Sequence, residues 1–183
     1  MRRRSDTKQT PSPAILALDP SLTAFGWCVV QNNTVVDSGC IKTTPEAKKR
    51  RIREGDDRVR RTSELIEILL NVIRKYDISF IVCELPHGSQ NSRAAVMIGI
   101  VVGMVQAISI CEDIPVEWFS EADAKKALLG RISASKAEVM QTIEEELDVK
   151  IKGPKYVREA IADALAIYYV ATIQSATLKI LMR

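Results

Sequence analysis

The sequence predicts an α/β fold with a mixed five-stranded sheet flanked by helices. Three strand-like segments come first, at 15–19, 26–31 and 35–43, and Asn32 and Asn33 can form a hairpin turn between the last two. Two further strand-like segments, 78–84 and 116–119, alternate with segments of helical periodicity. An antiparallel start followed by alternating helices and strands is typical of a mixed sheet covered by helices.

Apolar residues at helical spacing predict a helix over 56–76, and further helices are expected over 92–111, 121–128, 133–147 and 156–178. Ser133 is the expected N-cap of the fourth helix. The segment 94–110 is nearly uncharged, but it is shorter than the ~20 residues of a membrane span and contains Gln106 and Ser109. We therefore expect a buried helix, in which Gly99 and Gly103 allow another helix to approach closely.

Length and composition indicate one globular domain. The chain has 183 residues, of which 46% are hydrophobic and 27% charged, and its formal net charge of +3 is too small to identify a partner. We expect residues 1–13, which are polar and basic, to be a disordered tail, and residues 14–183 to be the single domain. A second basic run, 48–61, is either a solvated face or a surface that binds phosphate groups.

The four cysteines show no CxxC spacing and lie in or beside apolar runs: Cys28, Cys40, Cys83 and Cys111. Such residues are more typical of small buried hydrophobes than of metal ligands or disulfides. The N-terminus lacks the apolar stretch of a secretory signal. We therefore expect an intracellular, reducing compartment: the cytoplasm or nucleoid, or the host cytoplasm if the source is viral.

Four carboxylates stand out by their positions. Asp19 and Glu84 each close an apolar strand-like run, and Glu159 and Asp163 lie four apart in the last long helix. A buried carboxylate is costly unless a cation neutralises it, so these acids indicate one divalent-metal site. Hard oxygen ligands suit Mg²⁺ or Mn²⁺, and two such ions can hydrolyse a phosphodiester. For Asp19 alone, a turn before Pro20 is the simpler alternative.

Several segments resemble one known family. ILALDPSLTAFGWCVV, FIVCELPHGSQNSRAAVMIGIVVG, SEADAKKALLGRISASKAEV and EAIADALAI resemble, in this order, segments of the RuvC-like Holliday junction resolvases. That family belongs to the ribonuclease H-like nucleases, and the resemblance covers residues 14–171. It implies a ribonuclease H-like sheet in which Asp19, Glu84 and Asp163 are the metal-binding acids.

The chain departs from the family pattern at one position. The last acidic pair of the family is usually three residues apart, but the residue three before Asp163 is Ala160. Residues i and i+4 share a helix face as i and i+3 do, so Glu159 is our expected fourth ligand. A surface position at the start of the helix is the alternative for Glu159.

The resemblance also implies DNA contacts. Lys125 and Lys136 match lysines that approach the DNA backbone, and Lys126 and Arg131 lie in the same stretch. His87, the only histidine, falls where the family often has an aromatic residue that wedges into the junction. A plain loop residue, or a group that orients the attacking water, is the alternative for His87.

The implied function is a structure-selective endonuclease that resolves Holliday junctions and other branched DNA. It would nick symmetrically with two Mg²⁺ or Mn²⁺ ions per site and leave 5′-phosphate and 3′-hydroxyl ends. The implied partner besides branched DNA is a second copy of the chain, packed through 92–111, where Val101 and Met104 are expected contacts. We expect no membrane and no nucleotide cofactor. Two alternatives stay open: a non-catalytic branched-DNA-binding module, and an actin-like nucleotide phosphohydrolase suggested by LALDPSLTAFG.

Overall fold

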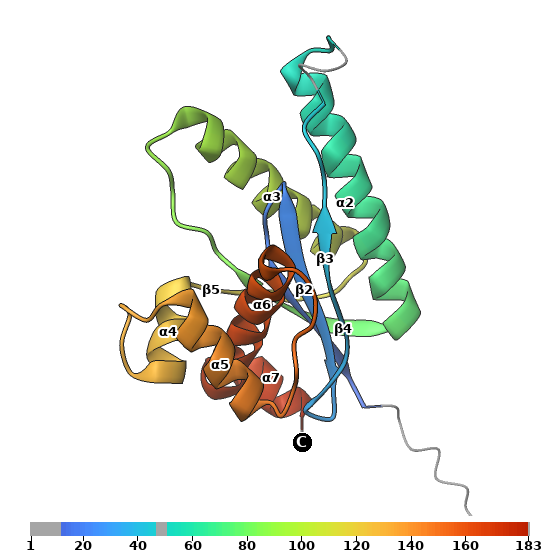
Figure 1. Ribbon diagram of the computed structural model, residues 1–183. Helices are drawn as coiled ribbons and strands as arrows, with labels where there is room; N and C mark the ends of the chain where they lie inside the picture. Colours follow the sequence, from blue (N-terminus) through green and yellow to red (C-terminus); the bar gives the residue numbers. More distant parts are fainter. Residues whose placement is uncertain (1–11, 47–50, 183) are drawn as a thin grey trace, which may run out of the picture.

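The computed structural model describes residues 12–46 and 51–182, and its centre is a mixed sheet of five strands (Figure 1). The strands stand in the order β3-β2-β1-β4-β5. They are β1 (Ala14–Asp19), β2 (Ala24–Gln31), β3 (Thr34–Lys42), β4 (Ile78–Glu84) and β5 (Val116–Phe119). The first three are antiparallel, whereas β4 is parallel to both β1 and β5. The predicted mixed five-stranded sheet is confirmed.

The turn between β2 and β3 is also as predicted. Asn32 and Asn33 adopt positive φ angles of 51° and 58°, which a tight two-residue hairpin requires and which asparagine tolerates better than most residues.

Helices cover both faces of the sheet (Figure 1). The α2 face carries α2 (Glu54–Tyr76) and α3 (Ser92–Cys111). The α6 face carries α4 (Glu121–Leu129), α5 (Lys136–Glu146), α6 (Lys155–Gln174) and α7 (Ala176–Leu181). Strand residues alternate between these faces, so Ile15 and Ala17 join the core under α6, whereas Leu16 and Leu18 join the core under α2 and α3.

Two helix boundaries differ from the sequence prediction by more than two residues. The helix expected from Ser133 begins at Lys136, because Ser135 caps it and the carboxylate of Glu138 accepts a hydrogen bond from the backbone N–H of Ser135. The helix expected over 156–178 ends at Gln174, where Ser175 leaves the helical conformation and its side chain caps α7 by accepting a hydrogen bond from the backbone N–H of Leu178. In both places a local serine cap sets the boundary.

Helix α6 packs directly onto the sheet. A side chain at Gly26 of β2 could not be accommodated, because its Cβ would lie 2.1 Å from the backbone carbonyl oxygen of Ala160. Glycine at this position therefore lets the helix backbone approach the strand closely. Most residues of α6 from Ala160 to Ala171 are buried.

The prediction that 92–111 is a buried helix is only partly right. Val101, Met104, Val105 and Ile108 pack against the sheet, but the opposite face is exposed, including Val96 and Ile110. Val101 and Met104 thus belong to the chain's own core and are not free for a dimer contact. By length and composition alone α3 could also cross a membrane, and 28% of its most apolar window is buried inside the protein. Cys111, expected to be buried, is exposed at the end of this helix.

Most arginines described in the basic run 48–61 form ion pairs with carboxylates nearby on α2. Arg53 pairs with Asp56, Arg58 with Glu54, and Arg60 with Asp57 and Glu64. Arg61 is buried and donates hydrogen bonds to Thr43, Leu22 and Thr23. These contacts favour a structural role over DNA binding for the arginines described. Lys48, Lys49 and Arg50 lie outside the described residues, as do residues 1–11 of the predicted tail.

Candidate active site

Two of the predicted acids meet at the carboxyl ends of the central parallel strands. Leu18 of β1 pairs with Cys83 of β4, so the next residues, Asp19 and Glu84, end neighbouring strands side by side. Alternation along each strand places both on the α6 face, since Ala17 and Val82, two residues earlier, lie in the core under α6. An acid at the end of each buried strand therefore points to the same side of the sheet.

The third acid comes from α6. Asp19 pairs with Gly26 across β1 and β2, and Gly26 touches the α6 backbone at Ala160. Asp163 lies about one turn further along the helix and so reaches the same end of the sheet. Lys136, the first residue of α5, places its Nζ 2.8 Å from Oδ2 of Asp163.

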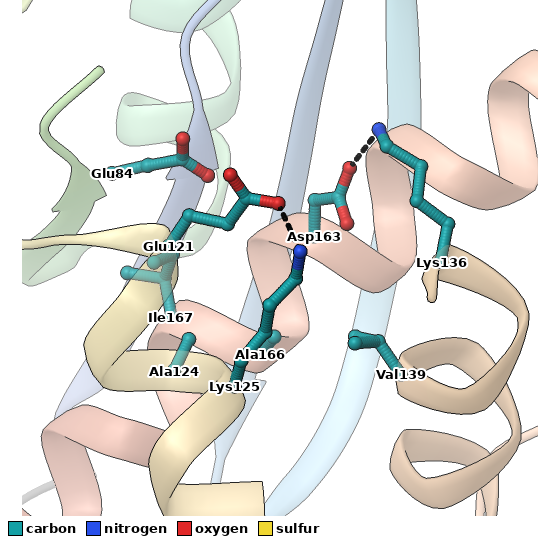
Figure 2. Close-up of a pocket in the computed structure, with 9 residues that line it drawn as sticks. All are labelled: Glu84, Glu121, Ala124, Lys125, Lys136, Val139, Asp163, Ala166 and Ile167. Carbon is teal, nitrogen blue, oxygen red and sulfur yellow. Dashed lines mark hydrogen bonds and ion pairs between the residues drawn. The ribbon is translucent and has the colours of Figure 1, made fainter. Parts of the chain in front are cut away.

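A small pocket lies where these elements converge (Figure 2). Figure 2 shows the carboxylates of Glu84, Glu121 and Asp163 grouped on one side of it, with the ammonium groups of Lys125 and Lys136 each paired to one of them. Its lining residues are Glu84, Glu121, Ala124, Lys125, Lys136, Val139, Asp163, Ala166 and Ile167.

The carboxylates interact strongly with one another. Burial raises the pKa of Asp19 well above its usual range, and the charges of Glu84 and Asp163 raise it further. Burial, followed by the charges of Asp163 and Glu121, raises the pKa of Glu84 to about 7. Burial also raises the pKa of Asp163, although the hydrogen bond from Lys136 opposes this shift. The site thus brings more carboxyl groups together than its two lysines can pair, and this crowding favours their protonated forms.

Sequence analysis missed Glu121. It is the first residue of α4, two residues after Phe119, which pairs with Glu84 across β4 and β5. Its Oε1 lies 2.7 Å from Nζ of Lys125. The signal was available, because Glu121 follows a parallel strand directly, as acids at this edge of the sheet do.

Glu159 lies near the site but outside the pocket lining. Its side chain is 27% exposed, and Oε1 lies 3.7 Å from Nζ of Lys155 one turn earlier on α6. Its charge still reaches Asp163, whose pKa it raises slightly. The structure thus brings Asp19, Glu84 and Asp163 together and leaves Glu159 at the rim.

The predicted DNA-contacting residues separate into two groups. Lys125 and Lys136 line the pocket. Lys126 is exposed outside the pocket lining, and Arg131 pairs with Glu138 on α5. His87 is exposed in the segment that follows β4.

The donor set suits a divalent cation in its chemistry. Three carboxylates with raised pKa values share one end of the sheet, and hard oxygen ligands are those that Mg²⁺ and Mn²⁺ prefer. Among the residues that the structure describes, however, no three His, Cys, Asp or Glu side chains converge closely enough to hold an ion. Lys136 is the cation that contacts Asp163. Residue types and positions fit the metal, whereas the side-chain conformations do not surround it.

Comparisons with known proteins agree with this architecture. The chain is 25% identical over 158 residues to a crossover junction endodeoxyribonuclease RuvC of Ehrlichia chaffeensis, covering 85% of this chain and 96% of the relative. It is 28% identical over 157 residues to that of Shewanella woodyi, covering 84% and 83%.

Solved structures show the same fold. Thermus thermophilus RuvC in complex with a Holliday junction substrate matches with a TM-score of 0.67 at 21% identity, over 89% of this chain and 97% of the other. The yeast mitochondrial Holliday junction resolvase Ydc2 matches with a TM-score of 0.65 at 12% identity, over 95% and 83%. The predicted ribonuclease H-like fold is confirmed.

The family model described as crossover junction endodeoxyribonuclease RuvC matches residues 15–170, a span that includes both strand-end acids and the acid of α6. The chain belongs to the RuvC family.

Proposed function

We propose that this protein is a metal-dependent, structure-selective endonuclease that resolves Holliday junctions and other branched DNA by symmetric nicking. The observation that carries the proposal is the meeting of Asp19, Glu84 and Asp163 from three elements, within a chain that matches the RuvC family over residues 15–170. Products with 5′-phosphate and 3′-hydroxyl ends follow from hydrolysis at the 3′-oxygen side of the phosphate.

Each group has a distinct task in this proposal. Asp19, Glu84 and Asp163 would hold Mg²⁺ or Mn²⁺, two ions per site, and the metal would supply the activation of water and the stabilisation of the leaving oxygen. Lys125 and Lys136 stand at the pocket, where their ammonium groups can bind phosphate oxygens of the DNA. Lys136, which pairs with Asp163 in this structure, would bind a phosphate oxygen of the DNA if that carboxylate were neutralised by a metal ion instead.

A cleavage assay on a synthetic four-way junction with Mg²⁺ tests the proposal. Asp19→Asn, Glu84→Gln and Asp163→Asn should each abolish cutting while junction binding persists, because charge is lost and volume is kept. Asp148→Asn is the matched control, since Asp148 is exposed and has a positive φ that asparagine also adopts. Nicks that ligase seals without further treatment would support the proposed ends. A near wild-type rate in any of the three variants would remove that residue from the site.

The fourth carboxylate has two candidates. Glu159 shares a helix face with Asp163 but lies outside the pocket lining, whereas Glu121 lines the pocket together with Asp163. If Glu159 is a ligand or supports one, Glu159→Gln should lower the cleavage rate by at least ~10-fold at limiting Mg²⁺. The same loss in Glu121→Gln, with Glu159→Gln unchanged, would transfer the role to Glu121.

We also propose a homodimer that packs through the exposed face of α3. This face carries small and apolar residues in a stripe: Val96, Gly99, Gly103, Ala107 and Ile110. A Cβ at Gly99 or Gly103 would meet nothing within 4 Å, so the backbone there is open to a second helix. A two-fold dimer would present two active sites to the two strands that a symmetric resolution must cut.

A branched-DNA-binding protein without nuclease activity is the second candidate function. Ala160 at the family's acidic position, and the pairing of Lys136 with Asp163, favour it. Junction binding with no cleavage in Mg²⁺ or Mn²⁺ would establish it, and ATP turnover would instead indicate a nucleotide phosphohydrolase. Both DNA functions place the protein inside the cell.

A further inference from the structure

A lysine and a tyrosine outside the pocket form a cation–π pair at the start of α6. Nζ of Lys42, the last residue of β3, lies 4.6 Å from the ring centroid of Tyr156. Both side chains are exposed, Tyr156 to 40%. Lys42 makes no ion pair with any carboxylate in the described ranges, so its charge is available to a partner.

The path of α6 links this pair to the active site. The helix begins beside β3, where Tyr156 meets Lys42, crosses β2 at the contact between Ala160 and Gly26, and reaches Asp163 at the pocket. Tyr156 and Asp163 are seven residues apart, which places them on one helix face about 10 Å apart along the axis. The distance across the sheet from β1 to β3, which is two strand spacings, is also about 10 Å, so it matches the distance between Tyr156 and Asp163 along the helix.

The segment that precedes Tyr156 in the chain is basic. Lys150, Lys152 and Lys155 are all exposed in the segment that leads into α6 and in its first turn. Within the part of the chain that the structure describes, the ion pairs of these three lysines are limited to that of Lys155 with Glu159, at 3.7 Å. A strand that crosses the pocket toward this segment would meet positive charge along its path.

We propose that Lys42, held by the ring of Tyr156, contacts the DNA backbone a few nucleotides from the phosphate that is cut. The ring attracts the ammonium and restricts it, so less side-chain freedom is lost when a phosphate binds. The contact is independent of sequence, because a phosphate is the same at every nucleotide. This inference rests on the proposed DNA substrate and adds to it a second anchoring point on the same helix face.

The test is junction binding in buffer without divalent cations, measured by fluorescence anisotropy over a range of salt concentrations. Lys42→Ala should weaken binding to a four-way junction several-fold and reduce the salt slope by about 1, the value for one lost phosphate contact. Tyr156→Ala should weaken binding to the same extent, whereas Tyr156→Phe, which keeps the ring, should bind as the wild type does. The double variant Lys42→Ala/Tyr156→Ala should be no weaker than Lys42→Ala, because both changes remove one contact.

The chain provides a matched control. Lys75 lies over the ring of Tyr76 at 4.5 Å, but this pair stands at the end of α2, and Lys75 is already 3.3 Å from Oδ2 of Asp37. Lys75→Ala removes the same charge and should leave the slope unchanged. Equal melting temperatures would establish that all variants fold.

The outcomes separate this inference from the proposed function. If wild type and Lys75→Ala bind the junction and Lys42→Ala keeps the full slope, the contact does not exist, although the function stands. If the effects of Lys42→Ala and Tyr156→Ala add, the tyrosine does not hold the lysine. If the wild type does not bind four-way DNA, the proposed function fails as well.

Discussion

The two faces of the sheet bury similar kinds of apolar side chains but differ in their buried charges. On the α2 face, Arg61 is buried and donates hydrogen bonds to nearby oxygens, whereas the α6 face gathers carboxylates that repel one another. Under α6, helix and strand backbones touch at Gly26, and three acids lie at the end of the strands. On the other face, α2 and α3 cover the sheet with long apolar side chains, and the outer face of α3 stays exposed.

This difference agrees with the two roles proposed above, an active site on the α6 face and a dimer interface on the outer face of α3. A pocket that binds cation and phosphate needs side chains held firmly, which close backbone packing provides. A surface that binds a second copy needs apolar area left uncovered, and α3 provides that. The following predictions test whether substitutions on one face change fold stability, dimerisation or charge-dependent behaviour without affecting the other face.

The largest effect is expected at the contact between sheet and α6. Gly26→Ala should destabilise the fold by about 3 kcal/mol and reduce cleavage, because the new Cβ must displace the backbone of Ala160 and with it Asp163. Gly55→Ala on α2 is the control, since a Cβ there meets nothing within 4 Å. Urea unfolding measures both variants. Equal unfolding midpoints for Gly26→Ala and Gly55→Ala would mean that α6 can shift away from β2 without loss of stability.

The next effect concerns the outer face of α3. Gly103→Glu should weaken the dimer by at least ~100-fold, because a carboxylate in a packed apolar interface is costly. It should leave the monomer stable, since the site is open and glutamate is a better helix former than glycine. Val101→Glu should instead unfold the chain, because Val101 is buried against the sheet. Sedimentation velocity measures the oligomeric state of both variants. A Gly103→Glu protein that stays dimeric would exclude this interface.

A smaller effect of pH is expected at Glu84. Its pKa in the folded protein is about 7, above the ordinary 4.5, so the folded state binds this proton more tightly than the unfolded state. The resulting stabilisation is complete below pH about 4.5 and is lost as the pH rises to about 7. Glu84→Gln, which stays neutral, should therefore gain about 2 kcal/mol relative to wild type between pH 5 and pH 8 without divalent cations.

Thermal unfolding over this pH range measures the gain. Added Mg²⁺ should raise the melting temperature of the wild type more at pH 8 than at pH 5.5, because the cation binds the ionised carboxylates. A constant difference between wild type and Glu84→Gln at all pH values would mean that Glu84 is not perturbed.

The smallest effect is expected from the pocket lysines. Lys125→Ala combined with Lys136→Ala should preserve the fold and the dimer but reduce the salt slope of junction binding by up to ~2, one for each lost phosphate contact. Lys179→Ala on α7, outside the pocket, is the control. A full slope in the double variant would show that these lysines serve only Glu121 and Asp163.

Local pattern was sufficient for much of this protein. Apolar runs and turn residues determined the five strands, and an acid closing each of two such runs identified Asp19 and Glu84 as a pair. Alternation along a strand is a local property, but the common face of these two acids depends on the pairing of Leu18 with Cys83, which joins segments far apart in the chain. Helix ends were predicted less well, because Ser133 and Ser135 offer similar caps and only Ser135 has Glu138 three residues later.

Tertiary structure decided what depends on contacts between elements. Helix α3 is apolar on all sides, so its periodicity could not indicate that Val101 faces the sheet and Gly103 faces outward. Three contacts depend on how distant segments pack together. They are the ion pair of Lys136 with Asp163, the place of Glu121 in the pocket, and the position of Lys42 over the ring of Tyr156. The sequence by itself thus determined the strands and singled out Asp19, Glu84 and Asp163, whereas the place of Glu121 and the charge partners of the acids arose only from packing α4, α5 and α6 against one end of the sheet.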